Sequence, residues 1–415
     1  MASKDRFYDS PRWSREIPDC SMPMTFDTYS NCSFGCLYCF SQFQRAIGGS
    51  KEAYLSHQVK SVSIEKIKRM FLTPETSQFG DFIKAKKVMQ WGGLSDPFCF
   101  FEKKLGVTLE LLKFFREIEY PLCFSTKATW WLDDKRYTDL FSGADNWNCK
   151  FSIITLDKRK ALHIEKGVPQ PTERLKAIEK YSKLNNGGAT LRLRPFIIGI
   201  SSPSHIDLIK SAADVGATAV STEFFCMEMR TPTAREKYKT MGKLAGFDIV
   251  SFYKKYSYGS GYLRLNRNVK RQYVDEMENT CKEKGLRFYV SDAHFKERCH
   301  NGSCCGLPES WNYSKGQFCE ALMIAKNKGS VRWSDFSDGL NYAKNFLWGR
   351  AQGYNANSSE TRAKFWGMTM YDYLKWCWNN PNSGSSPYVM FEGIIKPTTK
   401  DENNDYVYIY DKSRA

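Results

Sequence analysis

The chain contains the stretch Cys32-Ser-Phe-Gly-Cys36-Leu-Tyr-Cys39, in which three cysteines follow the spacing Cys-x3-Cys-x2-Cys. Thiolates are the usual protein ligands of iron–sulfur clusters. Three thiolates on a four-iron cluster leave one iron free to bind a small molecule, much as a catalytic zinc keeps one position open. A structural zinc normally needs a fourth Cys or His nearby, and none follows just downstream. The spacing therefore favours a cluster over zinc or over three unrelated buried cysteines.

This loop resembles the cluster-binding motif of the radical S-adenosylmethionine (SAM) enzymes, including the aromatic Tyr38 before the third cysteine. The resemblance implies a 4Fe–4S cluster on Cys32, Cys36 and Cys39, whose open iron chelates the amino and carboxylate groups of SAM. It also implies reductive cleavage of SAM to a 5′-deoxyadenosyl radical that abstracts hydrogen from a substrate. An electron donor such as flavodoxin or ferredoxin is then an expected partner. In such enzymes the protein supplies orientation and excludes side reactions.

A second motif, Gly92-Gly-Leu-Ser-Asp-Pro97, follows a predicted strand. Glycines at a strand end allow close backbone approach to a ligand, although an ordinary turn has the same composition. Here the motif resembles the one that holds the SAM amino group, and its Ser-Asp-Pro continuation, with Glu102 shortly after, resembles the spore photoproduct lyase-like branch of the family. The resemblance implies cofactor contacts from Gly92, Gly93 and Asp96.

A third run, Leu162-His-Ile-Glu-Lys-Gly-Val-Pro169, followed by Glu173-Arg-Leu175, also resembles this branch. His163 lies in this run and can relay protons, because histidine titrates near neutral pH. An ordinary loop histidine is the favoured interpretation.

Polar residues near the ends of three further predicted strands are candidate SAM contacts. Lys127 can grip the SAM carboxylate or simply extend to solvent, and Ser152 can donate to ribose hydroxyls. Arg194 shares a strand face with Arg192, and a buried arginine needs an anionic partner. We expect Arg194 to contact SAM or an acidic substrate group, with a structural pair to Glu165 or Glu223 as the alternative.

Two residues at the end of the sixth predicted strand are candidate catalytic groups. Glu223 and Cys226 lie at the expected mouth of the barrel. Cys226 can supply a hydrogen atom to a product radical, although buried cysteines more often act as small hydrophobic residues.

Short apolar runs alternate with helical patterns, which indicates βαβ units and a parallel sheet. We expect an α/β fold, a partial (β/α)6 TIM-like barrel of the radical SAM type, with its site at the carboxyl ends of the strands. The predicted organisation is a lead-in at 1–23, the barrel at 24–294, and a cysteine-rich, mostly helical C-terminal extension at 295–415. The predicted strands are Met24–Ser30, Lys87–Gly92, Leu122–Lys127, Lys150–Thr155, Thr190–Ile198, Thr218–Cys226, Arg287–Ser291 and Tyr406–Tyr410. The predicted helices are Phe101–Glu119, Thr172–Leu184, Asn268–Lys284, Lys315–Lys328 and Thr361–Asn379.

The C-terminal region contains a second cysteine group, Cys299, Cys304, Cys305 and Cys319, with His300 among them. This density favours an auxiliary iron–sulfur cluster, or a structural zinc, that stabilises a loop-rich region. The adjacent pair Cys304 and Cys305 is awkward for a single metal, and a reduced, unligated group is the alternative.

The whole chain has 415 residues and a net charge of +16, which favours a polyanionic partner, first of all nucleic acid. Basic residues interleave with aromatic ones at 252–258 and 262–273, a pattern that can hold single strands or flipped bases. The N-terminus shows no apolar signal segment, and no stretch is apolar enough to span a membrane. We therefore expect a cytoplasmic protein without a membrane partner, whose cysteines remain reduced.

The leading hypothesis is a radical SAM enzyme that acts on a nucleic-acid base, in DNA repair or modification. A peptide- or protein-modifying maturase with an auxiliary cluster is the second hypothesis, suggested by the C-terminal cysteines. A non-enzymatic, basic nucleic-acid-binding protein with a structural metal is the third, and it predicts zinc and no SAM cleavage.

Overall fold

The fold is that of a computed structural model, which describes residues 7–14, 20–41, 59–229, 232–259, 261–311, 316–352, 357 and 359–414. The chain forms two compact units. The first comprises Met1–Ser10, Phe26–Ile64 and Gln90–Val290, and the second comprises Pro11–Thr25, Glu65–Met89 and Ser291–Ala415.

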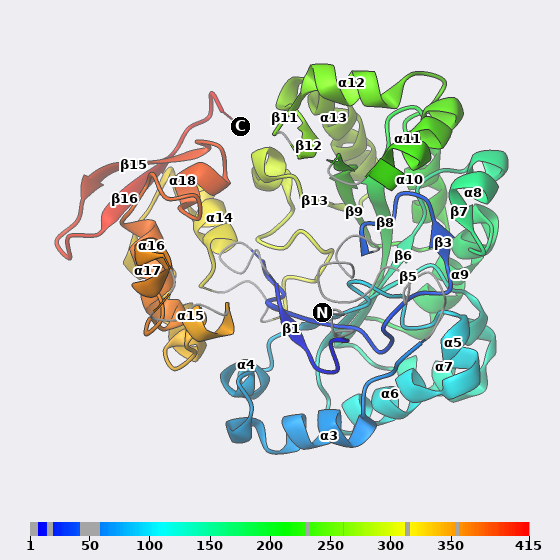
Figure 1. Cartoon of the computed structure of the whole chain (residues 1–415), viewed down its shortest axis with the longest axis horizontal. Coiled ribbons are helices and arrows are strands. Elements are labelled where there is room, and N and C mark those ends of the chain that lie inside the picture. Colours follow the sequence, from blue (N-terminus) through cyan, green and yellow to red (C-terminus); the bar gives the residue numbers. More distant parts are fainter. Residues whose placement is uncertain are drawn as a thin grey trace. The chain divides into compact units, whose positions relative to one another are not determined.

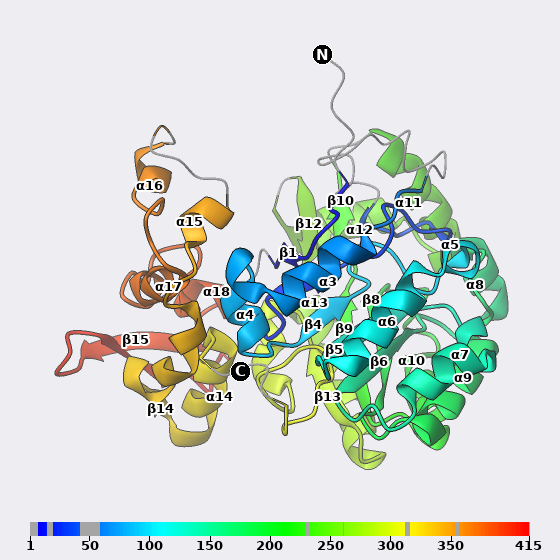
Figure 2. The same cartoon turned by 90° about the horizontal axis from the view of Figure 1, so that it is seen from below.

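The main sheet has the strand order β1-β2-β4-β5-β6-β8-β9-β13. From β5 to β13, each strand pairs in parallel with the next in this order. Helices α9 and α13 pack on these strands (Figures 1 and 2). The predicted partial β/α barrel is confirmed. The strands are β1 (Arg12–Trp13), β2 (Met24–Phe26), β4 (Met89–Trp91), β5 (Leu122–Thr126), β6 (Trp147–Ser152), β8 (Ala189–Phe196), β9 (Ala219–Phe224) and β13 (Arg287–Val290).

All seven strands predicted for the barrel are present, with ends shifted by up to four residues. These strands could be predicted from the sequence because they are buried on both faces, and such strands appear in a sequence as continuous apolar segments. Every residue of β5 and β6 is buried. The helices of this unit are α5 (Phe100–Leu105), α6 (Val107–Glu117), α7 (Lys135–Phe141), α8 (Lys158–Ile164), α9 (Pro171–Leu184), α10 (His205–Asp214), α11 (Pro232–Ala245), α12 (Ile249–Tyr256) and α13 (Arg267–Glu283).

The single helix predicted over 101–119 is wrong, because the structure has two helices there. Gly106 adopts φ 64°, a left-handed conformation that ends α5 and starts α6. Periodicity alone did not reveal the break, because Leu105, Leu109 and Leu112 keep helical spacing across Gly106 in the sequence, although Leu105 is exposed in the structure.

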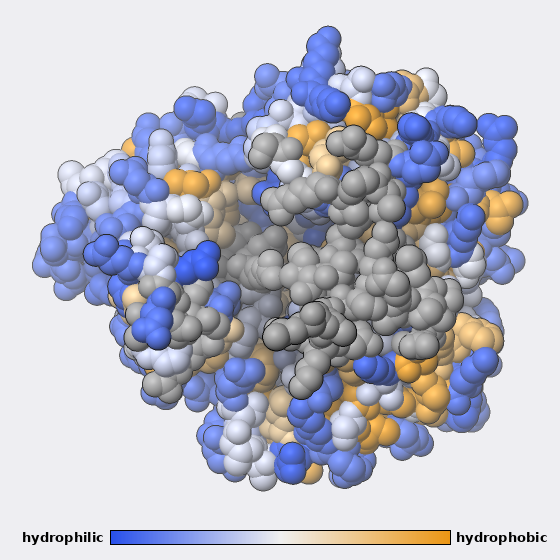
Figure 3. All heavy atoms as spheres, viewed as in Figure 1, coloured by the Kyte–Doolittle hydropathy of each residue, from blue (hydrophilic) through white to orange (hydrophobic). Residues whose placement is uncertain are grey.

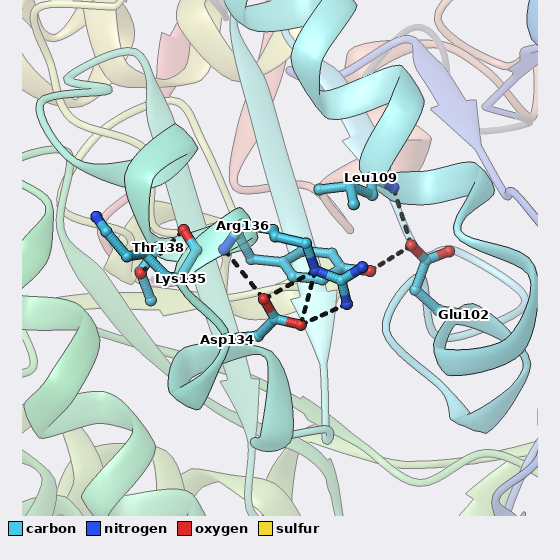
Figure 4. Close-up of polar contacts among 7 residues, drawn as sticks. Glu102, Leu109, Asp134, Lys135, Arg136 and Thr138 are labelled. Atoms are coloured by element: carbon cyan, nitrogen blue, oxygen red, sulfur yellow. Dashed lines mark hydrogen bonds and ion pairs between the residues drawn. The ribbon is translucent and has the colours of Figure 1, made fainter.

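A buried carboxylate stabilises this break. Glu102 on α5 is 1% exposed. Its oxygens accept hydrogen bonds from the amide of Leu109 at 2.9 Å (Figure 4) and from the amide of Thr108 at 2.8 Å, at the start of α6. The hydroxyls of Tyr29 and Tyr137 donate to the same carboxylate. Burial and the Glu102 charge raise the pKa of both tyrosines. Glu102 thus caps α6 and joins it to α7 and to the segment after β2.

The second unit has its own aromatic core. The Trp13 ring stacks on Phe79 at 4.2 Å between centroids and packs against Phe346 at 4.1 Å. These contacts explain why residues 11–25 and 65–89, which the sequence analysis assigned to the lead-in and the barrel, group with the C-terminal region.

The elements of the second unit are mostly short helices, with one small antiparallel sheet of order β14-β16-β15. The predicted strand Tyr406–Tyr410 is present as β16, whereas the helix predicted over 361–379 is two helices. The elements are α3 (Ile64–Leu72), α4 (Gly80–Lys84), α14 (Phe318–Lys328), α15 (Trp348–Ala351), α16 (Glu360–Ala363), α17 (Met370–Trp378), α18 (Pro387–Met390), β14 (Ser330–Val331), β15 (Ile395–Lys400) and β16 (Tyr406–Tyr410).

We expect Glu102→Ala to lower the free energy of unfolding by roughly 3 kcal/mol or more, because it leaves two buried hydroxyls and two helix amides without their acceptor. Chemical denaturation of the full chain measures the change. Glu110→Ala is the matched control, since Glu110 forms only an exposed pair with Lys113. Equal effects of the two substitutions would contradict the capping role.

Candidate functional site

The three-cysteine loop is held by a short antiparallel pairing. Strand β3 (Gly35–Cys36) pairs with β7 (Glu165–Lys166), with Cys36 opposite Glu165. The amide of Leu37 also donates to the carbonyl of Ile164 at 2.9 Å. The middle of the loop is thereby fixed to the segment that follows α8, the third run singled out in the sequence.

A buried ion pair lies beneath this pairing. Arg174 on α9 and Glu165 have side chains 1% exposed, with Nη2 and Oε2 at 2.6 Å. The Tyr38 hydroxyl donates to the other oxygen of Glu165. The second guanidinium nitrogen of Arg174 donates to the carbonyl of Ser152, at the end of β6, at 2.6 Å. One chain of contacts therefore joins the cysteine loop to the carboxyl end of the sheet.

The charges around the loop favour an ionised Glu165. Burial raises the pKa of Glu165, but the positive charges of Arg174 and Lys127 outweigh this effect and leave the pKa below its ordinary value. Lys127 follows β5, and its Nζ lies 5.6 Å from the centre of the Tyr38 ring. Burial raises the pKa of the Cys36 thiol, and Lys127 opposes this rise. Lys127 is thus placed beside the cysteine loop, and its contact with SAM stays a prediction.

The thiols of this loop fit a four-iron cluster. Cys36 is buried and interacts electrostatically with both Cys39 and Cys32. In the described ranges, no three His, Cys, Asp or Glu side chains converge on a single metal ion. A cluster instead takes each thiolate at a different iron, so the donor set of three thiols on one loop matches its chemistry. The cysteines that would hold it are Cys32, Cys36 and Cys39.

The glycine-rich turn after β4 is rigidly held. Asp27 accepts hydrogen bonds from the amides of Leu94 at 2.7 Å and Ser95 at 2.8 Å. Gly92 has φ 92°, and a Cβ there would lie 2.6 Å from the carbonyl oxygen of Ser125. Only glycine suits this position, because a side chain would be both strained and in collision. The turn is therefore preorganised, as a backbone-binding site requires.

Asp96, predicted to contact the cofactor, joins the turn to β5. Its carboxylate accepts hydrogen bonds from the Thr126 hydroxyl at 2.9 Å, the Lys127 amide at 2.6 Å and the Phe98 amide at 2.9 Å. Burial raises its pKa, and these hydrogen bonds oppose the rise. These contacts position Lys127, so Asp96 supports the predicted site from within the protein.

One face of the sheet is lined with polar groups. The parallel register pairs Ser125 with Lys150, and Ser152 with Arg192. Paired residues of neighbouring strands share a face. Lys150 is 2% exposed, and its Nζ contacts Gln90 at 2.5 Å. The Ser152 hydroxyl accepts a hydrogen bond from Arg192 at 3.4 Å. Ser152 thus lies on a cationic face, next to the chain of contacts that reaches the cysteine loop.

Arg194 forms an ion pair with Glu223 on β9, one of the alternatives open from sequence. Both side chains are partly exposed, so the pair can still meet a ligand. Cys226 follows β9, and its thiol donates to the Phe224 carbonyl at 3.7 Å. Burial, Cys226 and Glu223 raise the pKa of Tyr262 to about 12. Tyr262 therefore lies beside both predicted catalytic residues, which sequence reasoning did not foresee.

Cys99 was also missed. Its thiol forms a hydrogen bond with Cys32 that raises the pKa of Cys32 and lowers that of Cys99. Its position just two residues after the Gly92–Pro97 motif could have marked it as a site residue. The sequence spacing did not connect it to the cysteine loop, which lies sixty-seven positions earlier.

The second cysteine group belongs to the second unit. Cys299, Cys305 and Cys319 are buried, and the sulfurs of Cys304 and Cys305 are 3.8 Å apart. All fourteen cysteines lie in the described residues, and none of them forms a disulfide. In the part of the chain that the structure describes, this group does not converge on a metal ion, and an auxiliary cluster or zinc stays a prediction.

Solved structures provide a match in fold. A cysteine-to-serine variant of spore photoproduct lyase has a TM-score of 0.51 at 16% identity, covering 69% of this chain and 81% of that chain. A variant of the same protein with bound AdoMet and dinucleoside spore photoproduct has a TM-score of 0.50 at 16% identity, covering 69% and 80%. No protein-family model and no curated protein matches the chain. The fold is therefore the radical SAM partial barrel as found in spore photoproduct lyase, which confirms the predicted likeness at the level of architecture.

Among the helices of the described residues, none is long and apolar enough to cross a membrane.

Glu165→Gln should destabilise the iron-free chain by on the order of 3 kcal/mol at pH 7, because it leaves the buried Arg174 without its counter-charge. The folded-state pKa of Glu165 is lowered, so its stabilising contribution is present above the unfolded value near 4.5 and is lost as pH falls through the lower folded value. The gap between wild type and variant should therefore narrow below about pH 4.

Denaturant unfolding at several pH values measures this gap. Glu179→Gln, which removes an exposed pair with Lys183 on the same helix, is the control and should behave as wild type throughout. A gap that stays constant down to pH 2 would contradict the assigned charge state.

Proposed function

We propose that this chain is a radical SAM enzyme that acts on a base of a nucleic acid. The observation that carries the proposal is the three-thiol loop, pinned through Glu165 and Arg174 to the carboxyl end of a sheet with the spore photoproduct lyase fold. The preorganised turn at Gly92–Pro97 follows β4, the neighbour of β2 in the sheet, and its sequence resembles the family motif that holds SAM.

The residues divide into cluster-holding and SAM-contacting groups in this proposal. When bound, the 4Fe–4S cluster and SAM supply a carbon radical able to abstract hydrogen from a C–H bond. The protein binds, orients and shields these groups. Cys32, Cys36 and Cys39 hold the cluster. Asp96 holds Lys127 in place by its hydrogen bond to the Lys127 amide. The proposed SAM contacts are Gly92, Gly93, Lys127, Ser152 and Arg194.

Nucleic acid is the favoured substrate because of a basic, aromatic strip beside Glu223 and Cys226. Strand β12 (Tyr262–Leu265) carries Arg264 over the Tyr262 ring and pairs it with Tyr258 of β11 (Ser257–Tyr258). Both tyrosines are exposed. Stacking rings beside cations are the usual means of holding single strands and unstacked bases. Spore photoproduct lyase has been solved with a dinucleoside photoproduct, which supports the same substrate class.

A peptide- or protein-modifying enzyme is the second candidate. The buried cysteine group of the second unit favours it, since such a group can hold an auxiliary cluster. In both cases the free thiols suit a reducing compartment, and we place the enzyme in the cytoplasm with an external electron donor.

The chain, purified and reconstituted without oxygen, should bind about four irons and release deoxyadenosine when SAM and dithionite are added. Replacing Cys32, Cys36 and Cys39 with alanine should abolish both, and replacing the buried Cys149, which lies outside the loop, should abolish neither. About eight irons, falling to four in the triple variant, would establish an auxiliary cluster. Bound zinc with no deoxyadenosine would overturn the proposal.

Arg264→Ala combined with Tyr258→Ala should weaken binding of a single-stranded oligonucleotide by about tenfold, since one phosphate contact and one stacking platform are lost. Fluorescence anisotropy across a salt series measures the affinity, and the variant should show a shallower salt slope. Lys183→Ala on α9 is the control. Unchanged affinity, or tighter binding of a peptide than of the oligonucleotide, would favour the second candidate.

A further inference from the structure

A hollow with a volume of about 510 Å³ lies next to the cysteine loop. Aromatic side chains line it, among them Phe34 from the loop, Phe100 and Phe101 from α5, and Trp130 from the segment after β5. The Trp130 indole donates to the Phe98 carbonyl at 2.7 Å, which fixes this wall. Phe100 is 52% exposed, so the hollow presents an apolar surface to solvent. Hydrophobic residues also gather over α5 and α6 in the surface view (Figure 3).

The hollow lies next to Cys32, because the two residues that follow Cys32 in the chain line it. Ser33 and Phe34, which line it, follow Cys32 directly, and the Ser33 hydroxyl accepts a hydrogen bond from the Phe100 amide at 2.9 Å. A backbone hydrogen bond from Phe34 reaches the Cys32 thiol. None of the residues proposed to contact SAM is among its lining residues. The hollow therefore adjoins the cluster ligands without belonging to the proposed SAM site.

The rim of the hollow is basic. Lys103 lines it, with Nζ 5.1 Å from the Trp130 ring, and Lys104 lies over the Phe100 ring at 5.0 Å. Lys166 is exposed next to the lining residue Gly167. Within the described residues, none of these three lysines forms an ion pair with a carboxylate. The rim therefore keeps its full positive charge for a partner.

We propose that this hollow is the docking surface for an acidic protein that carries a low-potential flavin or iron–sulfur centre and delivers one electron to the cluster. The inference rests on the proposed function, since SAM cleavage needs an external reductant. One electron leaves the donor, which is oxidised by one electron. Passed on to the SAM sulfonium, this electron would break one carbon–sulfur bond. The methionine sulfur would keep two of the three electrons as a lone pair, and the deoxyadenosyl carbon would keep the third as the radical.

Charge and position favour this occupant over a nucleic acid. Complementary charge steers a partner into transient encounters, which electron-transfer complexes make over small interfaces. The exposed Phe100 ring, with Lys104 over it and Lys103 beside it on α5, provides the apolar anchor that such a contact needs. A substrate base must instead reach the SAM side of the loop, where the hydrogen is abstracted. A base held in this hollow would face the cluster ligands and none of the proposed SAM contacts.

The test compares two ways of reducing the same protein. Reconstituted full-length protein is reduced by dithionite or by reduced flavodoxin, and deoxyadenosine is measured in each case. Flavodoxin binding to the same protein is measured separately by calorimetry. The variants are Lys103→Glu with Lys104→Glu, and Phe100→Ala, whose exposed ring can be removed without disturbing the core. The control is Lys243→Glu with Lys282→Glu, two exposed lysines on α11 and α13.

We expect both hollow variants to bind flavodoxin at least about tenfold more weakly and to lose the flavodoxin-driven rate by a similar factor. Their dithionite-driven rate should stay at the wild-type level, and the control should match wild type in every assay. Wild-type flavodoxin binding in the variants would overturn the docking surface. So would a loss of oligonucleotide binding with normal flavodoxin-driven turnover, which would assign the hollow to nucleic acid. A wild-type protein that yields no deoxyadenosine with dithionite would instead refute the proposed function.

Discussion

The buried ion pair between Glu165 and Arg174 is the interaction on which the site depends. Glu165 receives the Tyr38 hydroxyl from the cysteine loop, and Arg174 donates to the Ser152 carbonyl at the end of β6. This contact thereby fixes the distance between two elements that carry different parts of the site. They are the cysteine loop after β2 and the end of the central strand β6. The site is built around this contact rather than around any single catalytic side chain.

A buried pair of this kind contributes little net stability, because desolvation of both charges offsets most of their attraction. Its value here is geometric. The two strands β3 and β7 are only two residues long, and so short a pairing does not hold a loop by itself. The planar guanidinium of Arg174 donates to a carboxylate with one nitrogen and to a carbonyl with another. It therefore fixes the orientation of both acceptors, which a lysine would not do. Asp96 also links two elements of the site, because its hydrogen bonds join the turn after β4 to Lys127 at the end of β5.

The architecture could be predicted from sequence to the extent that it is local. Strands buried on both faces appear as dense apolar runs, and the cysteine spacing identifies its own loop. The Glu165–Arg174 contact could not be predicted, because its geometry depends on the β3–β7 pairing, which has no periodic signal. The Gly106 break was hidden by leucines that keep helical spacing across it. The grouping of Trp13 with Phe79 and Phe346 joins segments that are far apart in the chain, a kind of contact that composition does not reveal.

The cysteine loop has two sides with different chemistry, and this asymmetry follows from the same clamp. Cys36 interacts electrostatically with Lys127, which opposes the rise of its pKa, and with Glu165, which adds to it. Cys32 lies beside Cys99 and the backbone of Phe34, and its chain neighbours Ser33 and Phe34 line the aromatic hollow. A group held by both thiols would be approached by SAM from one side and exposed to a protein partner on the other. In the proposed enzyme, fixing the middle of the loop through Tyr38 would keep these two sides apart. An electron would then enter without opening the site in which the radical must be shielded from water and from other C–H bonds.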